Sequence, residues 1–229
     1  MLRHVRTIGI VVVVAIGAVV MLACSNVMDQ YHDYIAEYRP DLYLYSDETY
    51  GIEVASGYRE KDFAMDGLVG AKVDFVIITV VPKHGLQEGE IFDYQLKSGD
   101  SVYKGKMVVH PFKENYSAEI PERTYGEPIE LILSSKGKQV GTYNMTVAAT
   151  PQMLSSKRAL AIATTQLKSQ IASMTHNGRL NGEVYILFVN NPIDSNAGVY
   201  WYVAFVNRTN NTYALLIDPI TEKVLARHV

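Results

Sequence analysis

The chain has 229 residues, of which 48% are hydrophobic, so it can bury one large core or two small ones. Its formal net charge is −3, and its 21 basic and 24 acidic residues are mixed along the chain without a block of one sign. Because nucleic-acid binding needs clustered Lys and Arg, this composition argues against a nucleic-acid partner.

A secretion signal is predicted at the N-terminus. Arg3 and Arg6 lie in a short basic region, and residues 8–23 form an almost unbroken apolar run. That run is short for a membrane span, which needs about 20 residues, but it fits the apolar part of a signal peptide. Cys24, the single Cys of the chain, follows directly and cannot form an internal disulfide.

The end of this run resembles the lipobox of bacterial lipoproteins, in which a small residue precedes a Cys that is lipidated and becomes the new N-terminus. Ala23 stands at the small position and Cys24 at the acceptor position, whereas Met21 and Leu22 are less typical. The resemblance implies that residues 1–24 are a signal peptide with a lipidated Cys. Acyl chains such as palmitate would then hold the protein on the extracytoplasmic side of the cell membrane. The alternative is an uncleaved signal anchor.

Residues 25–40 are predicted to form a tether helix. Val27, Tyr31, Ile35 and Tyr38 recur at spacings of three and four, which is typical of one amphipathic helix. Pro40 would end this helix. We expect its aromatic stripe to pack on the protein's own core rather than on lipid.

Residues 41–149 change to the period of two that indicates β-strands. Residues 72–81 give the strongest pattern, apolar on both faces, as in the middle of a buried sheet. Gly-containing turns are expected at residues 98–100 and 135–138. We predict an immunoglobulin-like β-sandwich without the usual Cys pair or central Trp. Its seven strands are expected near residues 42–45, 50–58, 72–81, 91–96, 102–109, 129–134 and 140–147.

A second domain is predicted over residues 151–229, because the pattern changes at Pro151. Ser155 or Ser156 can cap a helix, and Asn177-Gly178 is expected to close it. The apolar stripe of this helix is Leu160, Ala163, Leu167, Ile171 and Met174. Strands are expected at residues 183–189, 199–206, 212–217 and 223–226. The fold class is therefore mainly β, with one C-terminal helix packed on an antiparallel sheet as an α+β module.

Residues 155–163 begin the predicted helix with small apolar side chains, and residues 201–205 and 213–225 give paired strands with an Asp-x-x-Thr-x-Lys turn. In these features the segment resembles PepSY-type domains, although Glu222 stands where that family usually has Gly. The resemblance implies a module of secreted or membrane proteins that inhibits or modulates peptidases.

We expect no catalytic site, no metal site and no cofactor. The six His do not recur at helical spacing, and the sequence contains no HExxH motif, no Gly-x-Ser-x-Gly elbow and no phosphate-binding glycine loop. A Ser, His and Asp set could still assemble from distant residues.

The candidate partner-binding residues are Tyr200 and Tyr202. They share one face of the predicted strand at residues 199–206, while Trp201 and its neighbours on the other face are expected to lie under the helix. Sixteen Tyr against six Phe suit such partly exposed sheets.

These observations together predict a non-enzymatic lipoprotein that acts as a binding module outside the membrane. The expected partners are the membrane, through the lipid anchor, and a protein such as a peptidase or cell-wall enzyme. In this arrangement the β-sandwich carries the PepSY-like module away from the membrane. The alternatives are a secreted hydrolase with a site at the domain junction, and a structural or ligand-carrying lipoprotein.

Overall fold

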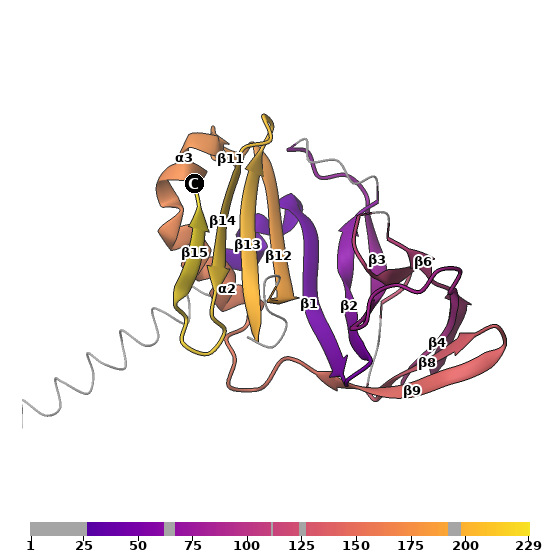
Figure 1. Ribbon diagram of the computed structural model, residues 1–229. Helices are drawn as coiled ribbons and strands as arrows, with labels where there is room; N and C mark the ends of the chain where they lie inside the picture. The colour runs from indigo at the N-terminus through magenta and orange to yellow at the C-terminus, as the bar shows by residue number, and fades with distance from the viewer. Residues whose placement is uncertain (1–26, 62–66, 111, 124–126, 192–197) are drawn as a thin grey trace, which may run out of the picture.

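The computed structural model describes residues 27–61, 67–110, 112–123, 127–191 and 198–229, and Cys24 and the predicted signal peptide lie outside these ranges. The described chain is mainly β, with antiparallel strands and few helices (Figure 1). Among the helices of these ranges, none is long and apolar enough to cross a membrane.

Thirteen strands join into one sheet system, and β10 and β11 form a separate hairpin. The strands are β1 (Ile35–Ser46), β2 (Tyr50–Glu60), β3 (Lys72–Pro82), β4 (Phe92–Ser98), β5 (Ser101–Lys106), β6 (Val108–Val109), β7 (Tyr116–Ile120), β8 (Ile129–Ser135), β9 (Lys138–Val147), β10 (Thr175–His176), β11 (Arg179–Leu180), β12 (Gly182–Asn190), β13 (Val199–Asn207), β14 (Thr212–Ile217) and β15 (Val224–His228). The helices are η1 (His32–Tyr34), α2 (Ser156–Gln166) and α3 (Lys168–Met174).

Strand β1 connects the two halves of the chain. It pairs in parallel with β12, where Ile35 lies opposite Val184, and antiparallel with β2 along most of its length. Near its end, Tyr43 and Leu44 pair with β9. One sheet therefore runs from β15 through β12, β1 and β2 to β3 and β7, as Figure 1 shows.

The predicted tether helix over residues 25–40 is wrong beyond residue 34. Residues 27–31 are helical and η1 follows, but the chain is extended from Ile35 onward. The apolar stripe itself was identified correctly, because Val27, Tyr31 and Ile35 are all buried. Pairing with β12 fixes the residues after Tyr34 as strand, so tertiary structure outweighs the helical spacing.

Pro40 lies inside β1, at a break in the pairing register between Tyr38 and Asp41. A residue without a backbone N–H is tolerated at such a bulge. Opposite the bulge stands Gly57, and a Cβ atom there would lie 2.0 Å from the carbonyl oxygen of Tyr38. Only glycine allows the two strands to approach this closely.

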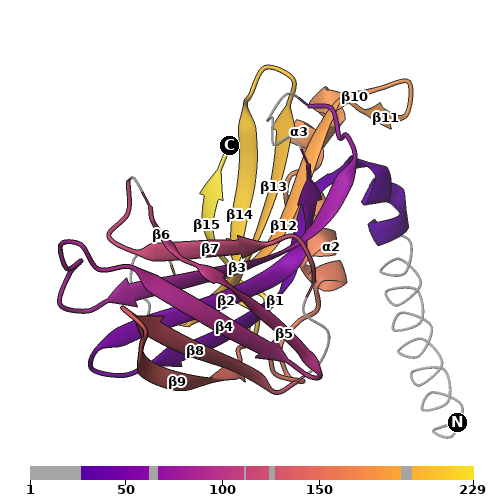
Figure 2. The same cartoon turned by 90° about the vertical axis from the view of Figure 1, so that its right-hand side faces the viewer.

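The predicted strands between residues 41 and 149 are present, and β7 is an additional strand that the sequence pattern did not reveal. Strands β2, β3 and β7 share one hydrophobic core with β4, β8 and β9, and Figure 2 shows the two sets crossing. The predicted turns are confirmed, since Gly99 and Gly137 both have positive φ. Fully buried side chains of this core include Val76, Ile78, Phe92 and Leu131.

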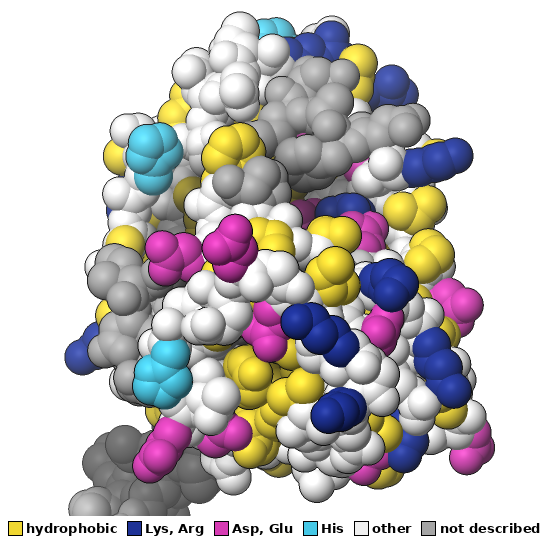
Figure 3. Space-filling view, turned by 45° about the vertical axis from the view of Figure 1, so that its right-hand side comes forward, with side chains coloured by type: hydrophobic (Ala, Val, Ile, Leu, Met, Phe, Trp, Pro, Cys, Tyr) yellow, Lys and Arg dark blue, Asp and Glu magenta, His cyan; other side chains and the backbone are white. Residues whose placement is uncertain are grey.

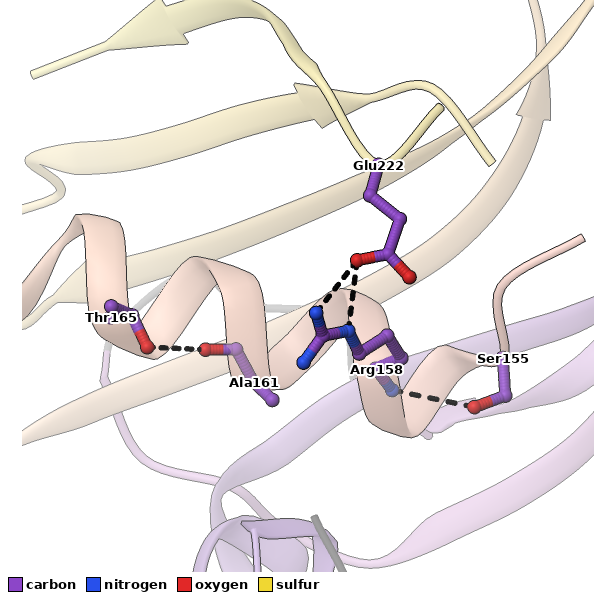
Figure 4. Close-up of polar contacts among 5 residues, drawn as sticks. All are labelled: Ser155, Arg158, Ala161, Thr165 and Glu222. Carbon is purple, nitrogen blue, oxygen red and sulfur yellow. Dashed lines mark hydrogen bonds and ion pairs between the residues drawn. The ribbon is translucent and has the colours of Figure 1, made fainter. Parts of the chain in front are cut away.

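The predicted C-terminal helix is two helices, α2 and α3, which meet at Leu167. Ser155 caps α2 by accepting from the backbone N–H of Arg158, and the whole predicted apolar stripe is buried. The hydroxyls of Thr164 and Thr165 both donate to the carbonyl of Ala161, which weakens the helical ladder before the break. Figure 4 shows the contact from Thr165.

We predicted that Asn177 and Gly178 close this helix, and this is wrong. They form the turn between β10 and β11. Their φ angles of 50° and 75° suit a two-residue hairpin turn, which requires positive φ at both positions.

The helices and the first described residues share a second hydrophobic core on one face of β12, β13 and β14. Tyr31 makes an edge-to-face ring contact with Phe205, and Trp201 donates its indole N–H to the carbonyl of Leu154 at 2.9 Å. The prediction that Trp201 lies in the core is therefore confirmed. Residues 27–35 contribute to the same core as α2, because Val27, Tyr31 and Ile35 pack in it.

Candidate functional site: an open face of the sheet

Strands β12 and β13 carry the helices on one face only. On their other face, the part of the chain that the structure describes places neither a helix nor a second layer of strands (Figures 1 and 2). This face continues onto β1 and β2. We call it the open face, and we define it by six residues, of which Tyr185 is buried and the other five are partly exposed: Glu37, Arg39, Arg59, Tyr185, Leu187 and Tyr202.

Strand pairing sets these residues in two rows. Tyr202 lies opposite Leu187, and Leu187 lies opposite Arg39. In the neighbouring row, Tyr185 lies opposite Glu37, and Glu37 lies opposite Arg59. Because directly paired residues project from the same side of a sheet, both rows lie on one surface.

The charges of the open face are held within the sheet. Arg39 Nε lies 3.8 Å from Glu37 Oε1, and the two side chains are only 19% and 14% exposed. Arg59 is bound through Nη2 to both carboxylate oxygens of Glu119, at 2.6 Å each. The guanidinium of Arg59 also lies 5.1 Å from the ring centre of Phe75, which it covers.

Burial raises the pKa of Glu37, and the positive charges of Arg39 and Arg59 oppose that rise. Burial likewise raises the pKa of Glu53, which stands on the same face of β2 as Arg59 and is also opposed by Arg39. Carboxylates of this kind are stabilised as anions only while positive charge remains close to them.

Arg39 has unused hydrogen-bonding capacity. Its Nε atom is buried, and among the described residues it has no hydrogen-bond partner. A buried donor without a partner is unfavourable, and because this Nε atom is itself buried, an external acceptor could reach it only if the side chain moved. The centre of the open face therefore places a guanidinium beside aromatic and apolar side chains.

A cavity of about 360 Å³ lies beside Glu53, near the far end of β1. Leu44, Glu53 and Thr79 lie directly opposite one another on β1, β2 and β3 and form its floor. Val81 and Asn190 also line the cavity. It therefore combines apolar walls with the half-buried carboxylate of Glu53.

One end of the open face is covered by residues 67–69, in the segment that follows β2. Glu183 is fully buried and accepts hydrogen bonds from the backbone N–H of Gly67 and, at 2.6 Å, from the hydroxyl of Tyr185. Burial and the contact with Glu183 both raise the pKa of Tyr185. Val69 packs beside Tyr202 and Leu187 against the small apolar cluster of this end.

No known protein family, characterised protein or solved structure matches this chain.

Both predicted partner-binding residues lie on β13, and both are half-buried rather than fully exposed. Tyr202 belongs to the open face, and burial raises the pKa of its hydroxyl. Tyr200 lies opposite Val189, one row beyond Tyr202. The predicted lipidation site, Cys24, lies outside the described residues.

The charged centre of the site was not predicted from the sequence. Glu37 and Arg39 were placed in the predicted tether helix, so their alternation in a strand was not considered. Glu53 and Arg59 do alternate within a predicted strand, and that spacing could have placed them on one face.

Other polar sites on the molecule are less organised. A cavity of about 620 Å³ near η1 is lined by Asp33, Tyr34, His176, Arg179 and Arg208, among others, and most of these side chains are exposed. Within the described ranges, no three His, Cys, Asp or Glu residues are grouped as a metal site would require. The surface in Figure 3 shows acidic and basic side chains interspersed with hydrophobic ones.

Proposed function

We propose that this protein is a lipid-anchored, extracytoplasmic bacterial binding protein, and that its open face contacts a protein partner. The observation that carries the proposal is the row formed by Tyr202, Leu187 and Arg39, which are partly exposed on a sheet face that no described helix or second strand layer covers. Tyr and Arg are the residue types most often found at the energetic centre of protein interfaces, where they bind within an apolar surround.

The chemistry of the open face favours a partner with both apolar and polar groups. Leu187 and Tyr202 offer apolar area, and the partly exposed guanidinium of Arg39 offers donors to a carbonyl or carboxylate oxygen. The cavity beside Glu53 can receive one projecting side chain of the partner. The positive and negative side chains of the open face lie close together. The face would therefore select a partner by where the partner's charged groups lie, and not by the partner's net charge.

Two finer assignments of architecture are part of this proposal. Strands β2, β3 and β7 face a second set of strands in the order β5, β4, β8 and β9. This strand order is that of the Greek-key arrangement in immunoglobulin-like sandwiches, so it supports that assignment. The packing of helix α2 on β12, β13 and β14 supports the assignment of the PepSY-like module.

The turn before β15 gives that module further support. Asp218 accepts from the backbone N–H groups of Ile220 and Thr221, and Glu222 has φ of 59°. A positive φ at position 222 is consistent with Gly in the PepSY-type turn.

A peptidase or cell-wall enzyme is the partner class that we propose, from the PepSY-like resemblance. The test uses purified wild-type protein and two variants, Leu187→Lys on the open face and Val102→Lys on β5, as bait for proteins of the cell envelope. Wild type and Val102→Lys should retain the same enzyme and change its rate, whereas Leu187→Lys should lose both effects. Equal retention by all three baits would exclude the open face as the binding surface.

The anchor is tested separately, because it depends on the N-terminal sequence and not on the open face. Mass spectrometry of the mature protein should find an N-terminal peptide that begins at Cys24 and carries acyl chains. Cys24→Ala should remain unprocessed and unlipidated. A mature, membrane-bound protein without lipid on Cys24 would contradict the proposal.

A further inference from the structure

The distance between the proposed lipid anchor and the folded body is very short. Val27 is 7% exposed and packs in the core beneath the helices, so the body begins at that residue. Only Ser25 and Asn26 separate it from Cys24. Even fully extended, this stretch spans at most about 11 Å between the Cα atoms of residues 24 and 27.

The helical layer lies on the same side of the sheet as this attachment point. Tyr31 contacts the ring of Phe205 on the face of β13 that α2 also covers. Figures 1 and 2 both show the turn at residues 27–31 and α2 on that side. A lipid on Cys24 would therefore bring the helical layer, and not the strands β4, β8 and β9, closest to the membrane.

The charge of α2 and α3 differs from that of the whole chain, whereas the residues nearest the attachment point include the exposed carboxylates Asp29 and Asp33. Helices α2 and α3 carry Lys157, Arg158 and Lys168 and no carboxylate, and no Asp or Glu occurs between Glu130 and Glu183. Arg158 is paired with Glu222, and in the described part of the chain Lys157 and Lys168 have no ion pair. Both are exposed.

Arg227 adds a further positive charge at the same place. It donates from Nη2 to the carbonyl of Gln166 at the end of α2, at 2.9 Å. Lys and Arg side chains beside a membrane are attracted to anionic headgroups within about one Debye length, roughly 10 Å.

We propose that the outer surface of α2 and α3, with Lys157, Lys168 and Arg227, lies on the membrane and contacts anionic phospholipid headgroups. The inference rests on the proposed lipidation of Cys24. It places the open face on the opposite side of β12 and β13, where a partner can reach it.

The experiment uses the full-length, lipidated protein in vesicles of phosphatidylcholine and phosphatidylglycerol. Once Cys24 is lipidated its thiol is blocked, so a new Cys can carry an environment-sensitive fluorophore. Ser169→Cys places the fluorophore on α3, and Ser101→Cys places it on β5 as the matched control. Quenching by spin-labelled lipid headgroups then measures how close each position lies to the membrane.

We expect several-fold stronger quenching at position 169 than at position 101. The charge changes Lys157→Glu and Lys168→Glu together should reduce it, whereas Lys104→Glu with Lys138→Glu should not. A Gly/Ser spacer inserted after Asn26 should also reduce it. In vesicles of phosphatidylcholine alone the difference between the two positions should shrink.

Three results would contradict the proposal, and membrane pelleting, performed first, separates a missing anchor from the other two. If the protein pellets with vesicles but position 169 is quenched no more than position 101, the lipid anchor stands and the orientation is wrong. If quenching at 169 is strong but independent of phosphatidylglycerol and of both Lys→Glu changes, headgroup recognition is wrong. If Cys24 carries no lipid, both the proposed function and this inference are wrong.

Discussion

Arg158 on α2 is bound to Glu222 in the turn before β15, with 2.7 Å between Nη2 and Oε2 and 3.0 Å between Nε and the same oxygen (Figure 4). This pair joins the helical layer to the last turn of the chain. Both side chains are about 40% exposed, so the pair itself contributes little, roughly 0.2–1 kcal/mol. The left-handed backbone of Glu222 has the opposite effect on stability. A non-glycine residue in this conformation lowers the free energy of unfolding by about 1 kcal/mol relative to glycine.

These two effects can be separated at position 222. Glu222→Ala removes the ion pair and keeps the left-handed strain, so its free energy of unfolding should fall by up to about 1 kcal/mol. Glu222→Gly removes both, and should be more stable than Glu222→Ala by about 1 kcal/mol. Urea titration followed by circular dichroism measures the difference. Equal stability of the two variants would show that the turn is not strained at this residue.

Gly57 provides a sharper test of the β1 bulge. Gly57→Ala would place a Cβ atom 2.0 Å from the backbone oxygen of Tyr38, and we expect a loss of more than about 3 kcal/mol or failure to fold. Gly51→Ala, in the same strand, meets no atom within 4 Å and should change the free energy of unfolding by less than about 1 kcal/mol. Similar stabilities for the two variants would mean that the bulge is not as close as described.

The shared core predicts that residues 151–229 cannot fold alone. Without residues 27–39 that fragment loses Val27, Tyr31 and Ile35 from its core and the parallel partner of β12. We expect an unfolded or aggregated fragment by circular dichroism and proton NMR, whereas residues 27–229 should fold. A well-dispersed NMR spectrum from the short fragment would show that the C-terminal half is autonomous.

Glu37 predicts a specific pH dependence of stability. Burial, its largest influence, raises the pKa of Glu37 above the unfolded value, so the folded state holds the proton to a higher pH than the unfolded state does. Stability from this group is therefore fully present below the unfolded pKa, about 4.3, and is lost as pH rises through the folded pKa. Relative to wild type, Glu37→Gln should gain stability between pH 4 and pH 7. A constant difference across that range would contradict the assignment.

The sequence was sufficient for the local elements but not for their arrangement. Period-two patterns located most strands, and the spacing of Leu160, Ala163 and Leu167 identified the buried face of the helices. The pairing of β1 with β12 joins residues about 150 positions apart, and no local pattern encodes it. For that reason residues 35–39 were predicted as helix, and the charged centre of the open face was not found.

Tyr202 shows the same limit within the candidate site. Alternation along β13 predicted which face it occupies, but its neighbours Leu187 and Arg39 come from two other strands. An interface built across strands becomes visible only when the register is known.

The central claim is that the open face is the surface that binds a protein partner, and site-specific photo-crosslinking in intact cells tests it most directly. A benzophenone amino acid at position 202 should give one crosslinked protein species, and Arg39→Ala in the same chain should reduce its yield several-fold. The same amino acid at position 102, on β5, should give no such species. If position 102 crosslinks as well as position 202, or if Arg39→Ala leaves the yield unchanged, the open face is not the binding surface.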